Sequence, residues 1–199
     1  MVGIIDYGVG NLFSLRSSFA AIGAEAFVSS DAAQLAKADR LILPGVGAFG
    51  DAAEKLRASG LDAFVREQAA AGKPLMGICL GMQLLFERSF EYGEHFGLGL
   101  LKGQVVGMSG RLPEGLKIPH MGWNALKLTK SAKLLEEGSY VYFVHSFYAE
   151  NCEDSIAAVT DYGIPITAAV EKDNIFGCQF HPEKSGNVGL AILKKFCEV

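Results

Sequence analysis

The sequence predicts an α/β fold, a single domain in which a mostly parallel central sheet is flanked by helices and the C-terminal half adds antiparallel strands. Short apolar runs alternate with helix-like stretches through residue 78. Continuous apolar strands of this kind are typical of parallel sheets that helices cover on both faces. Glycine-rich turns follow two of these runs, and beyond about residue 100 the chain reads as a series of short strand-like segments.

In the first half, the apolar pattern predicts strands at 2–5, 26–29, 41–43 and 75–78. Helices are expected between them, at 11–22, 31–36, 51–56 and 61–71, with a further helix-like stretch at 83–88. In the second half, strands are expected at 105–108, 123–128, 140–147, 155–160, 166–170 and 175–179, before a closing helix at 188–196. Because no repeat or linker interrupts these elements, we expect one domain over residues 1–199.

The composition narrows the class of protein. The chain has 199 residues, a net charge of −4 and no basic run, which argues against a nucleic acid or an anionic membrane as its main partner. No apolar stretch approaches the roughly 20 residues that span a bilayer, and the first residues do not read as a signal peptide, so we expect a cytoplasmic location. The four cysteines form no C-x-x-C pair, so the sequence indicates neither a disulfide framework nor a redox motif.

The most informative segment places Cys79 between Gly77 and Gly81, directly after the apolar run at 74–76. This Gly-x-Cys-x-Gly spacing predicts a sharp strand-to-helix turn, or elbow, that holds a nucleophile clear of the sheet. The first turn of the following helix favours the reactive thiolate, because its free N–H groups and its dipole attract negative charge. The alternative interpretation is a small buried cysteine at the end of a strand.

A second segment supplies an imidazole and a carboxylate. His181 ends an apolar strand and is followed by Pro182 and Glu183. Proline keeps the residue before it extended, so Glu183 is expected near the same side of the chain as His181, where one carboxylate can orient one imidazole. Cysteine, histidine and acid together are the groups of a nucleophilic triad. His181 also has a ligand-like spacing from Cys178, but no further ligands accompany the two, and we expect no metal site.

The turn from Gly45 to Gly50, between a strand and a helix, is expected to offer backbone N–H groups to an oxyanion. We expect the donors to be Gly47 or Val46, together with Leu80, the residue after the nucleophile. The same glycines satisfy G-x-G-x-x-G, so a dinucleotide-binding module is the rival interpretation. This match does not lie in the first βα unit and is followed by helix-like sequence, so we rank the rival second.

The three segments occur in the order and at the spacing found in the class I, or triad, glutamine amidotransferases, and the sequence resembles that family over nearly its whole length. The resemblance implies hydrolysis of glutamine through a thioester on Cys79, with His181 and Glu183 and without a cofactor. Segments 5–11, 44–49, 119–124 and 142–146 resemble more closely the glutaminase subunits that serve histidine biosynthesis. The glutaminase partner of pyridoxal phosphate synthase is the alternative subgroup.

The resemblance also implies residue roles and a partner. Gln83 lies one helical turn after Cys79, on the same face, where its amide can reach a substrate. Contacts to the glutamine substrate are implied for Gln83, Glu91, Ser146 and Phe147, and the alternative for Glu91 is a place on a solvated helix face. The implied partner is a cyclase subunit, a (β/α)₈ barrel that forms a heterodimer with this chain and receives its ammonia. The candidate contact residues are Asn11, His120, Met121, Trp123 and Lys184. Alternatively, Trp123 lies in the core, His120 is a histidine at a strand end whose hydrogen bonds are satisfied, and Lys184 is a solvated surface charge.

Overall fold

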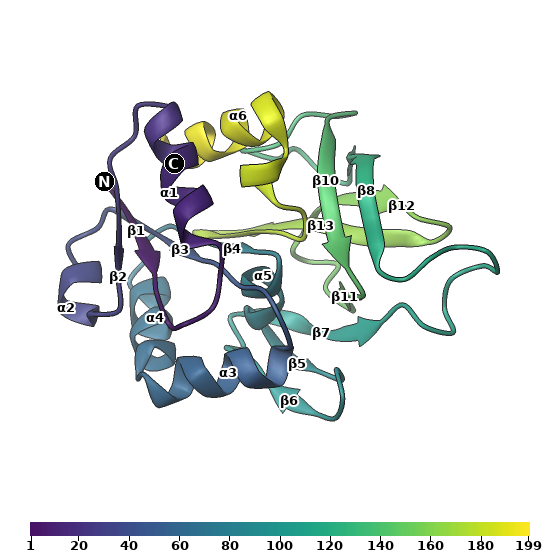
Figure 1. Cartoon of the computed structure of the whole chain (residues 1–199), viewed down its shortest axis with the longest axis horizontal. Helices are drawn as coiled ribbons and strands as arrows, with labels where there is room; N and C mark the ends of the chain where they lie inside the picture. Colours follow the sequence, from purple (N-terminus) through teal and green to yellow (C-terminus); the bar gives the residue numbers. More distant parts are fainter.

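A sheet of eight strands forms the centre of the structure, a computed structural model that describes residues 1–199 (Figure 1). Its strand order is β2-β1-β3-β4-β14-β13-β12-β9. The first five strands in this order run parallel, and they are β2 (Ala26–Ser29), β1 (Val2–Ile5), β3 (Arg40–Leu43), β4 (Leu75–Ile78) and β14 (Ile175–Cys178). The other three pair antiparallel, and they are β13 (Pro165–Lys172), β12 (Ile156–Asp161) and β9 (Lys127–Leu128).

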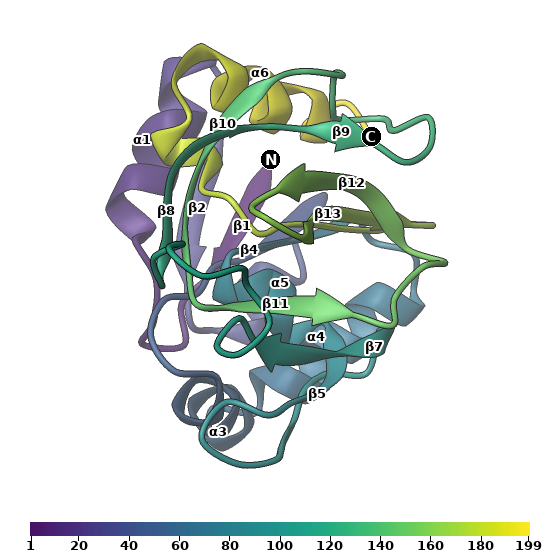
Figure 2. The ribbon, with the colours of Figure 1, turned by 90° about the vertical axis from the view of Figure 1, so that its right-hand side faces the viewer.

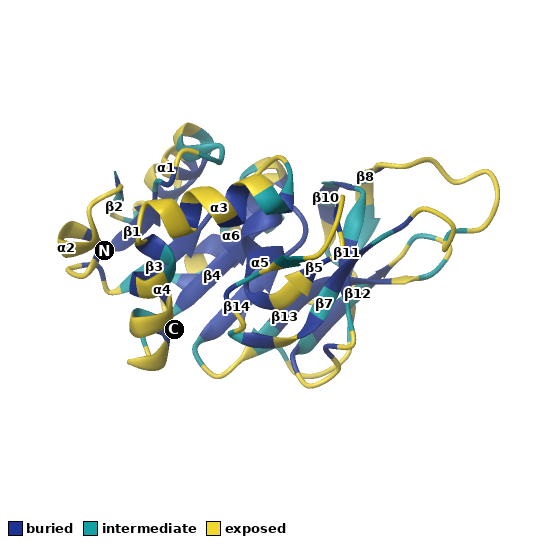
Figure 3. Cartoon of the chain, turned by 90° about the horizontal axis from the view of Figure 1, so that it is seen from below, coloured by how far each residue is buried: buried dark blue, intermediate teal, exposed yellow.

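Helices cover both faces of this sheet. On one face lie α1 (Leu12–Ala21) and α6 (Gly186–Phe196), and on the other lie α3 (Phe49–Ala58) and α4 (Leu61–Ala70) (Figure 1). Alternate residues of one strand therefore enter two different cores: Leu41 and Leu43 pack with α3 and α4, and Ile42 packs with α1 and α6. Figure 3 shows the central strands buried and the outer helix faces exposed. No helix has the length and apolar character needed to cross a membrane.

Two smaller sheets extend the C-terminal half. One has the order β11-β7-β5-β6 and consists of β11 (Phe147–Glu150), β7 (Leu101–Gly107), β5 (Phe86–Ser89) and β6 (His95–Phe96). The other pairs β8 (His120–Ala125) antiparallel with β10 (Tyr140–His145) (Figure 2). The remaining elements are the short helices α2 (Ala32–Leu35) and α5 (Leu80–Leu84) and a 3₁₀ helix at Pro182–Lys184.

The predicted fold class is confirmed, but the helix expected at 83–88 is wrong. Helix α5 ends at Leu84, and the chain continues as strand β5. The carbonyl of Leu85 accepts the N–H groups of Leu100 and Leu101, at 2.9 and 3.0 Å, and the carbonyl of Leu84 accepts that of Leu98. Because these acceptors are already engaged by a distant segment, they are not available to continue the helix.

The carboxyl ends of the parallel strands meet at one edge of the central sheet. The segments that leave this edge are the loop after β1, the glycine-rich turn after β3, the elbow after β4 and the His-Pro-Glu segment after β14. Open α/β sheets bind their ligands outside this edge. The fold therefore gathers the three motifs at one place, although about a hundred positions of chain separate the elbow from the His-Pro-Glu segment.

Candidate active site

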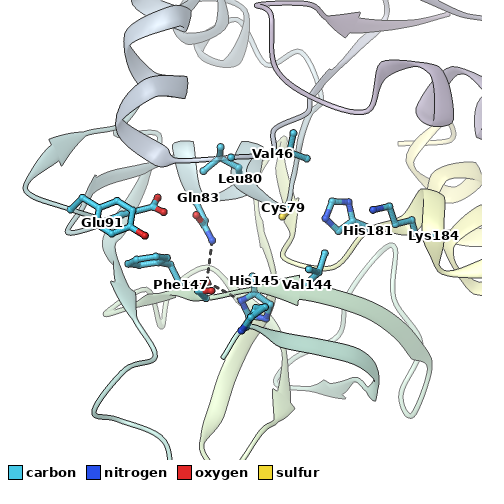
Figure 4. Close-up of a pocket in the computed structure, with 14 residues that line it drawn as sticks. Val46, Cys79, Leu80, Gln83, Glu91, Val144, His145, Phe147, His181 and Lys184 are labelled. Atoms are coloured by element: carbon cyan, nitrogen blue, oxygen red, sulfur yellow. Dashed lines mark hydrogen bonds between the residues drawn. The ribbon is translucent and has the colours of Figure 1, made fainter. Parts of the chain in front are cut away.

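Residues from the segments after β3, β4 and β14, together with residues of the two smaller sheets and their loops, line a cavity of about 370 Å³ (Figure 4). The lining includes the expected nucleophile, imidazole, oxyanion donors and substrate-binding residues. It consists of Val46, Gly47, Cys79, Leu80, Gln83, Glu91, Tyr92, Pro119, Val144, His145, Ser146, Phe147, His181 and Lys184. The cavity thus collects side chains from both halves of the chain.

Cys79 occupies the turn between β4 and α5. Its backbone has φ 54° and ψ −111°, which is uncommon for any residue with a side chain. A Cβ on Gly77 would lie 2.6 Å from the Gly81 carbonyl oxygen, and one on Gly81 would lie 1.8 Å from the Leu43 carbonyl oxygen. The strained elbow predicted from the sequence is therefore present, and its two glycines are required by close backbone packing.

His181 leaves the end of β14 with its ring held on one side by an acid. Its Nδ1 lies 2.8 Å from Oε1 of Glu183, and both side chains are at most 4% exposed. The main chain of His181 is also fixed, because its N–H donates to the Tyr142 carbonyl at 3.0 Å and its carbonyl accepts from the Ser185 hydroxyl at 2.6 Å. This leaves Nε2 as the ring nitrogen that can exchange a proton with the cavity.

The electrostatics of the pair favour a protonated imidazole. Burial alone would lower the pKa of His181, but interactions with the Cys79 sulfur and with the Glu183 carboxylate outweigh it and raise the pKa to about 9. Figure 4 shows the His181 ring beside the Cys79 sulfur. The arrangement can hold a proton next to a nucleophilic sulfur and deliver it to a leaving group.

The expected oxyanion donors lie beside Cys79. Leu80 is the first residue of α5, so its N–H has no acceptor within the helix. Gly47 has φ 95°, and the side chain of Val46 is 41% exposed. The dinucleotide interpretation does not fit this turn, because the N-terminus of α3 is already capped: the Phe49 N–H donates to a carboxylate oxygen of Glu91 at 2.7 Å.

The residues expected to bind substrate reach the same cavity. Gln83 donates from Nε2 to the Phe147 carbonyl at 3.1 Å, while Ser146 and Phe147 line the wall opposite the elbow helix. Glu91 is 8% exposed, and burial raises its pKa even though the Phe49 N–H favours the charged form. A carboxylate next to backbone N–H groups and a side-chain amide can recognise both charged groups of an amino acid.

Sequence reasoning missed Gln179, a fully buried polar side chain next to Cys79. Its Oε1 accepts from Gln83 Nε2 at 2.9 Å, and its own Nε2 donates to the Cys79 sulfur at 3.7 Å. The available signal was its place in an otherwise apolar strand end, two residues before His181, because a fully buried glutamine is uncommon and needs hydrogen-bond partners.

His145 was also missed. Its Nδ1 donates to the Phe147 carbonyl at 2.8 Å, and its Nε2 lies 3.0 Å from Nδ1 of His120. Burial lowers the pKa of His145 to about 3, so this imidazole is neutral. A polar network thus runs from β8 through the Phe147 carbonyl to Gln83, and the two bonds to this carbonyl are drawn in Figure 4.

One of the expected partner contacts, His120, does not lie on the surface, so the prediction for this residue is wrong. Met121 and Trp123 are 60% and 52% exposed on the outer face of β8, and Lys184 is exposed at the cavity. Adjacent residues of a strand point to opposite faces, so His120 points inward and is fully buried. Asn11 is half-buried and caps α1 by accepting the Ser14 N–H at 3.4 Å.

The fold and this site define a class of protein. The model of the family "Glutamine amidotransferase class-I" matches residues 3–199, and the chain belongs to that family. In two solved structures the fold is similar: a glutamine amidotransferase (TM-score 0.77, 20% identity) and PurLQS from Thermotoga maritima (TM-score 0.74, 21% identity). Each comparison covers 99% of this chain and 97% of the other.

More similar relatives carry a more specific name. The chain is 52% identical to the imidazole glycerol phosphate synthase subunit HisH of Wolinella succinogenes, over the full length of both chains. It is 51% identical to the subunit of the same name from Methanothermobacter thermautotrophicus, over all of this chain and 98% of the other.

Proposed function

We propose that this chain is the glutaminase subunit of an imidazole glycerol phosphate synthase, which hydrolyses glutamine and passes ammonia to a cyclase subunit in histidine biosynthesis. The observation that carries the proposal is that Cys79 and His181 line one cavity, while Glu183 accepts from the far ring nitrogen of His181 at 2.8 Å. Full-length relatives about half identical to this chain bear the name of that subunit. Residues 1–199 act as one amidotransferase domain, which is supported by the family match to residues 3–199.

In the first half of the reaction, the Cys79 thiolate attacks the side-chain amide carbon of glutamine. The carbonyl electrons move onto oxygen, which accepts hydrogen bonds from the N–H of Leu80 and from that of Gly47 or Val46. His181 gives its Nε2 proton to the amide nitrogen, the C–N bond breaks and ammonia leaves, so that a glutamyl thioester remains. The raised pKa of His181 supports this role, because the imidazole carries its proton at neutral pH.

In the second half, neutral His181 takes a proton from water while the oxygen attacks the thioester carbon. The tetrahedral intermediate again places its negative oxygen at the same donors, and its collapse releases glutamate and restores the Cys79 thiolate. Glu183 keeps its position throughout, where it orients the ring and stabilises the imidazolium.

The substrate lies along the cavity with its amide at Cys79. Gln83 and the backbone of Ser146 and Phe147 hold the amino-acid end, and Glu91 receives its ammonium group. Their common place in the cavity lining supports these roles. A buried carboxylate next to a cation is stabilised in its charged form, which offsets the effect of burial on Glu91.

The proposed partner is the cyclase subunit, a (β/α)₈ barrel in a heterodimer. Large exposed apolar side chains mark interaction surfaces, and aromatic residues contribute much of the binding energy at such sites. Met121 and Trp123 provide such a surface on β8, while Lys184 at the cavity and Asn11 at the start of α1 extend it. Ammonia is reactive only while unprotonated, so docking over the cavity would keep it from bulk water.

The proposal is tested by a glutaminase assay of the chain, alone and with the candidate cyclase subunit, with Cys79→Ala as the control. We expect slow hydrolysis by the isolated chain, a strong rise in kcat with the partner and its ligand, and no activity in Cys79→Ala. A thiol-directed glutamine analogue should add its mass at Cys79. Undiminished hydrolysis by Cys79→Ala, or no adduct at this residue, would contradict the mechanism.

A further inference from the structure

Tyr7 lies beneath the turn that carries the expected oxyanion donors. It follows β1, its side chain is buried, and its hydroxyl donates to the Pro44 carbonyl oxygen at 2.7 Å. No backbone N–H donates to this carbonyl, so the phenol is its hydrogen-bond partner. Tyr7 is not among the residues that line the cavity.

The first half of the turn is packed tightly between Tyr7 and the elbow. A Cβ on Gly45 would lie 3.0 Å from the Tyr7 hydroxyl, 2.8 Å from the Gly81 nitrogen and 2.9 Å from the Leu80 Cβ. The second half is open, because a Cβ on Gly47 would meet no atom within 4 Å. The turn is therefore anchored at Gly45, and because no packing fixes the peptide groups beyond it, their direction depends on that anchor.

We propose that Tyr7 is a positioning residue for oxyanion stabilisation: by holding the Pro44 carbonyl, it sets the direction in which the Val46 and Gly47 N–H groups face Cys79. The inference rests on the proposed glutaminase reaction and adds to it a residue that contacts neither glutamine nor ammonia. An oxyanion donor contributes fully only when its direction is fixed before charge develops, so the anchor of the turn affects the rate of reaction.

The surroundings of Tyr7 suit this role. Burial, with a further contribution from the nearby Cys79 sulfur, raises the pKa of the phenol, so the hydroxyl keeps its hydrogen and remains a donor. The loop that carries Tyr7 is itself held, because the Gly8 N–H donates to the Asp6 side chain at 3.0 Å. The loop also touches the turn directly, since a Cβ on Gly10 would lie 2.9 Å from the Pro44 Cβ.

The test is Tyr7→Phe, which removes only the hydroxyl oxygen. Tyr162→Phe is the matched control, because the Tyr162 hydroxyl donates to a backbone carbonyl, that of Lys117, at 2.8 Å and lies outside the cavity. Each full-length variant is assayed for kcat and KM with glutamine, alone and with the cyclase subunit, and for its unfolding midpoint. Inhibition by glutamate γ-semialdehyde is measured as well, because this aldehyde forms a tetrahedral adduct with the thiolate and places an oxyanion at the donors.

In Tyr7→Phe we expect about a tenfold fall in kcat and a similar rise in the inhibition constant of the aldehyde, with KM for glutamine within twofold of the wild type. In Tyr162→Phe all three constants should stay within twofold. Unchanged kcat and inhibition in Tyr7→Phe would overturn the proposal, as would a parallel rise in KM, which indicates general distortion. If the wild type itself hydrolyses no glutamine, the proposed function fails instead, and the two failures are thereby distinguished.

Discussion

Replacing Glu183 with glutamine tests whether this carboxylate sets the protonation of His181. The substitution preserves the size of the side chain and removes the negative charge 2.8 Å from Nδ1 of His181. Both side chains are at most 4% exposed, so water screens the pair weakly. The glutamine oxygen can still accept from Nδ1, and we therefore expect the ring to stay in place while the pKa of His181 falls.

The magnitude follows from the raised pKa. A rise from 6.5 to about 9 corresponds to a preference of roughly 3 kcal/mol for the imidazolium. The Cys79 sulfur and the Glu183 carboxylate both contribute to this preference, so loss of the carboxylate alone should lower the pKa of His181 by about one unit. Because the native pKa exceeds the unfolded one, this stabilisation is complete below pH 6.5 and is lost as the pH rises through 9. Between about pH 6 and pH 10, the wild type should lose about 1 kcal/mol more stability than Glu183→Gln.

The assay is an NMR titration of the four histidines, in which His181→Gln identifies the resonance, together with urea unfolding at several pH values. Glu136→Gln is a suitable control, because it removes an exposed carboxylate that pairs with Lys195 on the surface. We expect kcat to fall in Glu183→Gln and to be unchanged in Glu136→Gln. An identical His181 titration in the wild type and in Glu183→Gln would refute the reasoning.

Three further substitutions have defined outcomes. Gly81→Ala would place a Cβ 1.8 Å from a carbonyl oxygen of β3, so it should lower the free energy of unfolding, measured in urea, by more than about 3 kcal/mol. The loss should be far larger than in Gly138→Ala, where space is open and only the positive φ of 74° disfavours a side chain. Gln179→Leu removes the amide that faces the Cys79 sulfur and should lower kcat/KM for glutamine about tenfold; steady-state rates equal to the wild type would contradict this role. Trp123→Ala should weaken binding of the cyclase subunit at least about tenfold by calorimetry, and unchanged affinity would remove this residue from the interface.

The sequence predicted the parallel half of the fold well, because strands buried on both faces are continuously apolar and their ends are marked by glycine. Strand β5 was missed for a physical reason. A short apolar run such as 83–88 fits a helix or a strand equally. The choice depends on residues 98–101, whose N–H groups donate to the carbonyls of Leu84, Leu85 and Phe86.

The chemistry of the site was predictable where one local segment fixes a role. Cys79 lies between two glycines at the Gly-x-Cys-x-Gly spacing that a strained turn requires. His181 is followed two residues later by Glu183, the acid that its ring contacts. Gln179 and His145 have no such local signature. Each is a single polar residue at the end of an apolar strand, and its role depends on partners at least two and as many as a hundred positions away.

The burial of His120 connects the outer strand β8 to the cavity. On one face of β8, Met121 and Trp123 are exposed, and on the other His120 contacts His145 at 3.0 Å. The Nδ1 of His145 donates to the Phe147 carbonyl, which also accepts from the side-chain amide of Gln83. Any movement of β8 that shifts His120 must either break this chain of hydrogen bonds or move the carbonyl with it, because buried polar groups cannot be left without partners at low cost. A partner bound to the exposed face of β8 would therefore act on the same strand that is linked, through His120 and His145, to the Phe147 carbonyl in the cavity wall.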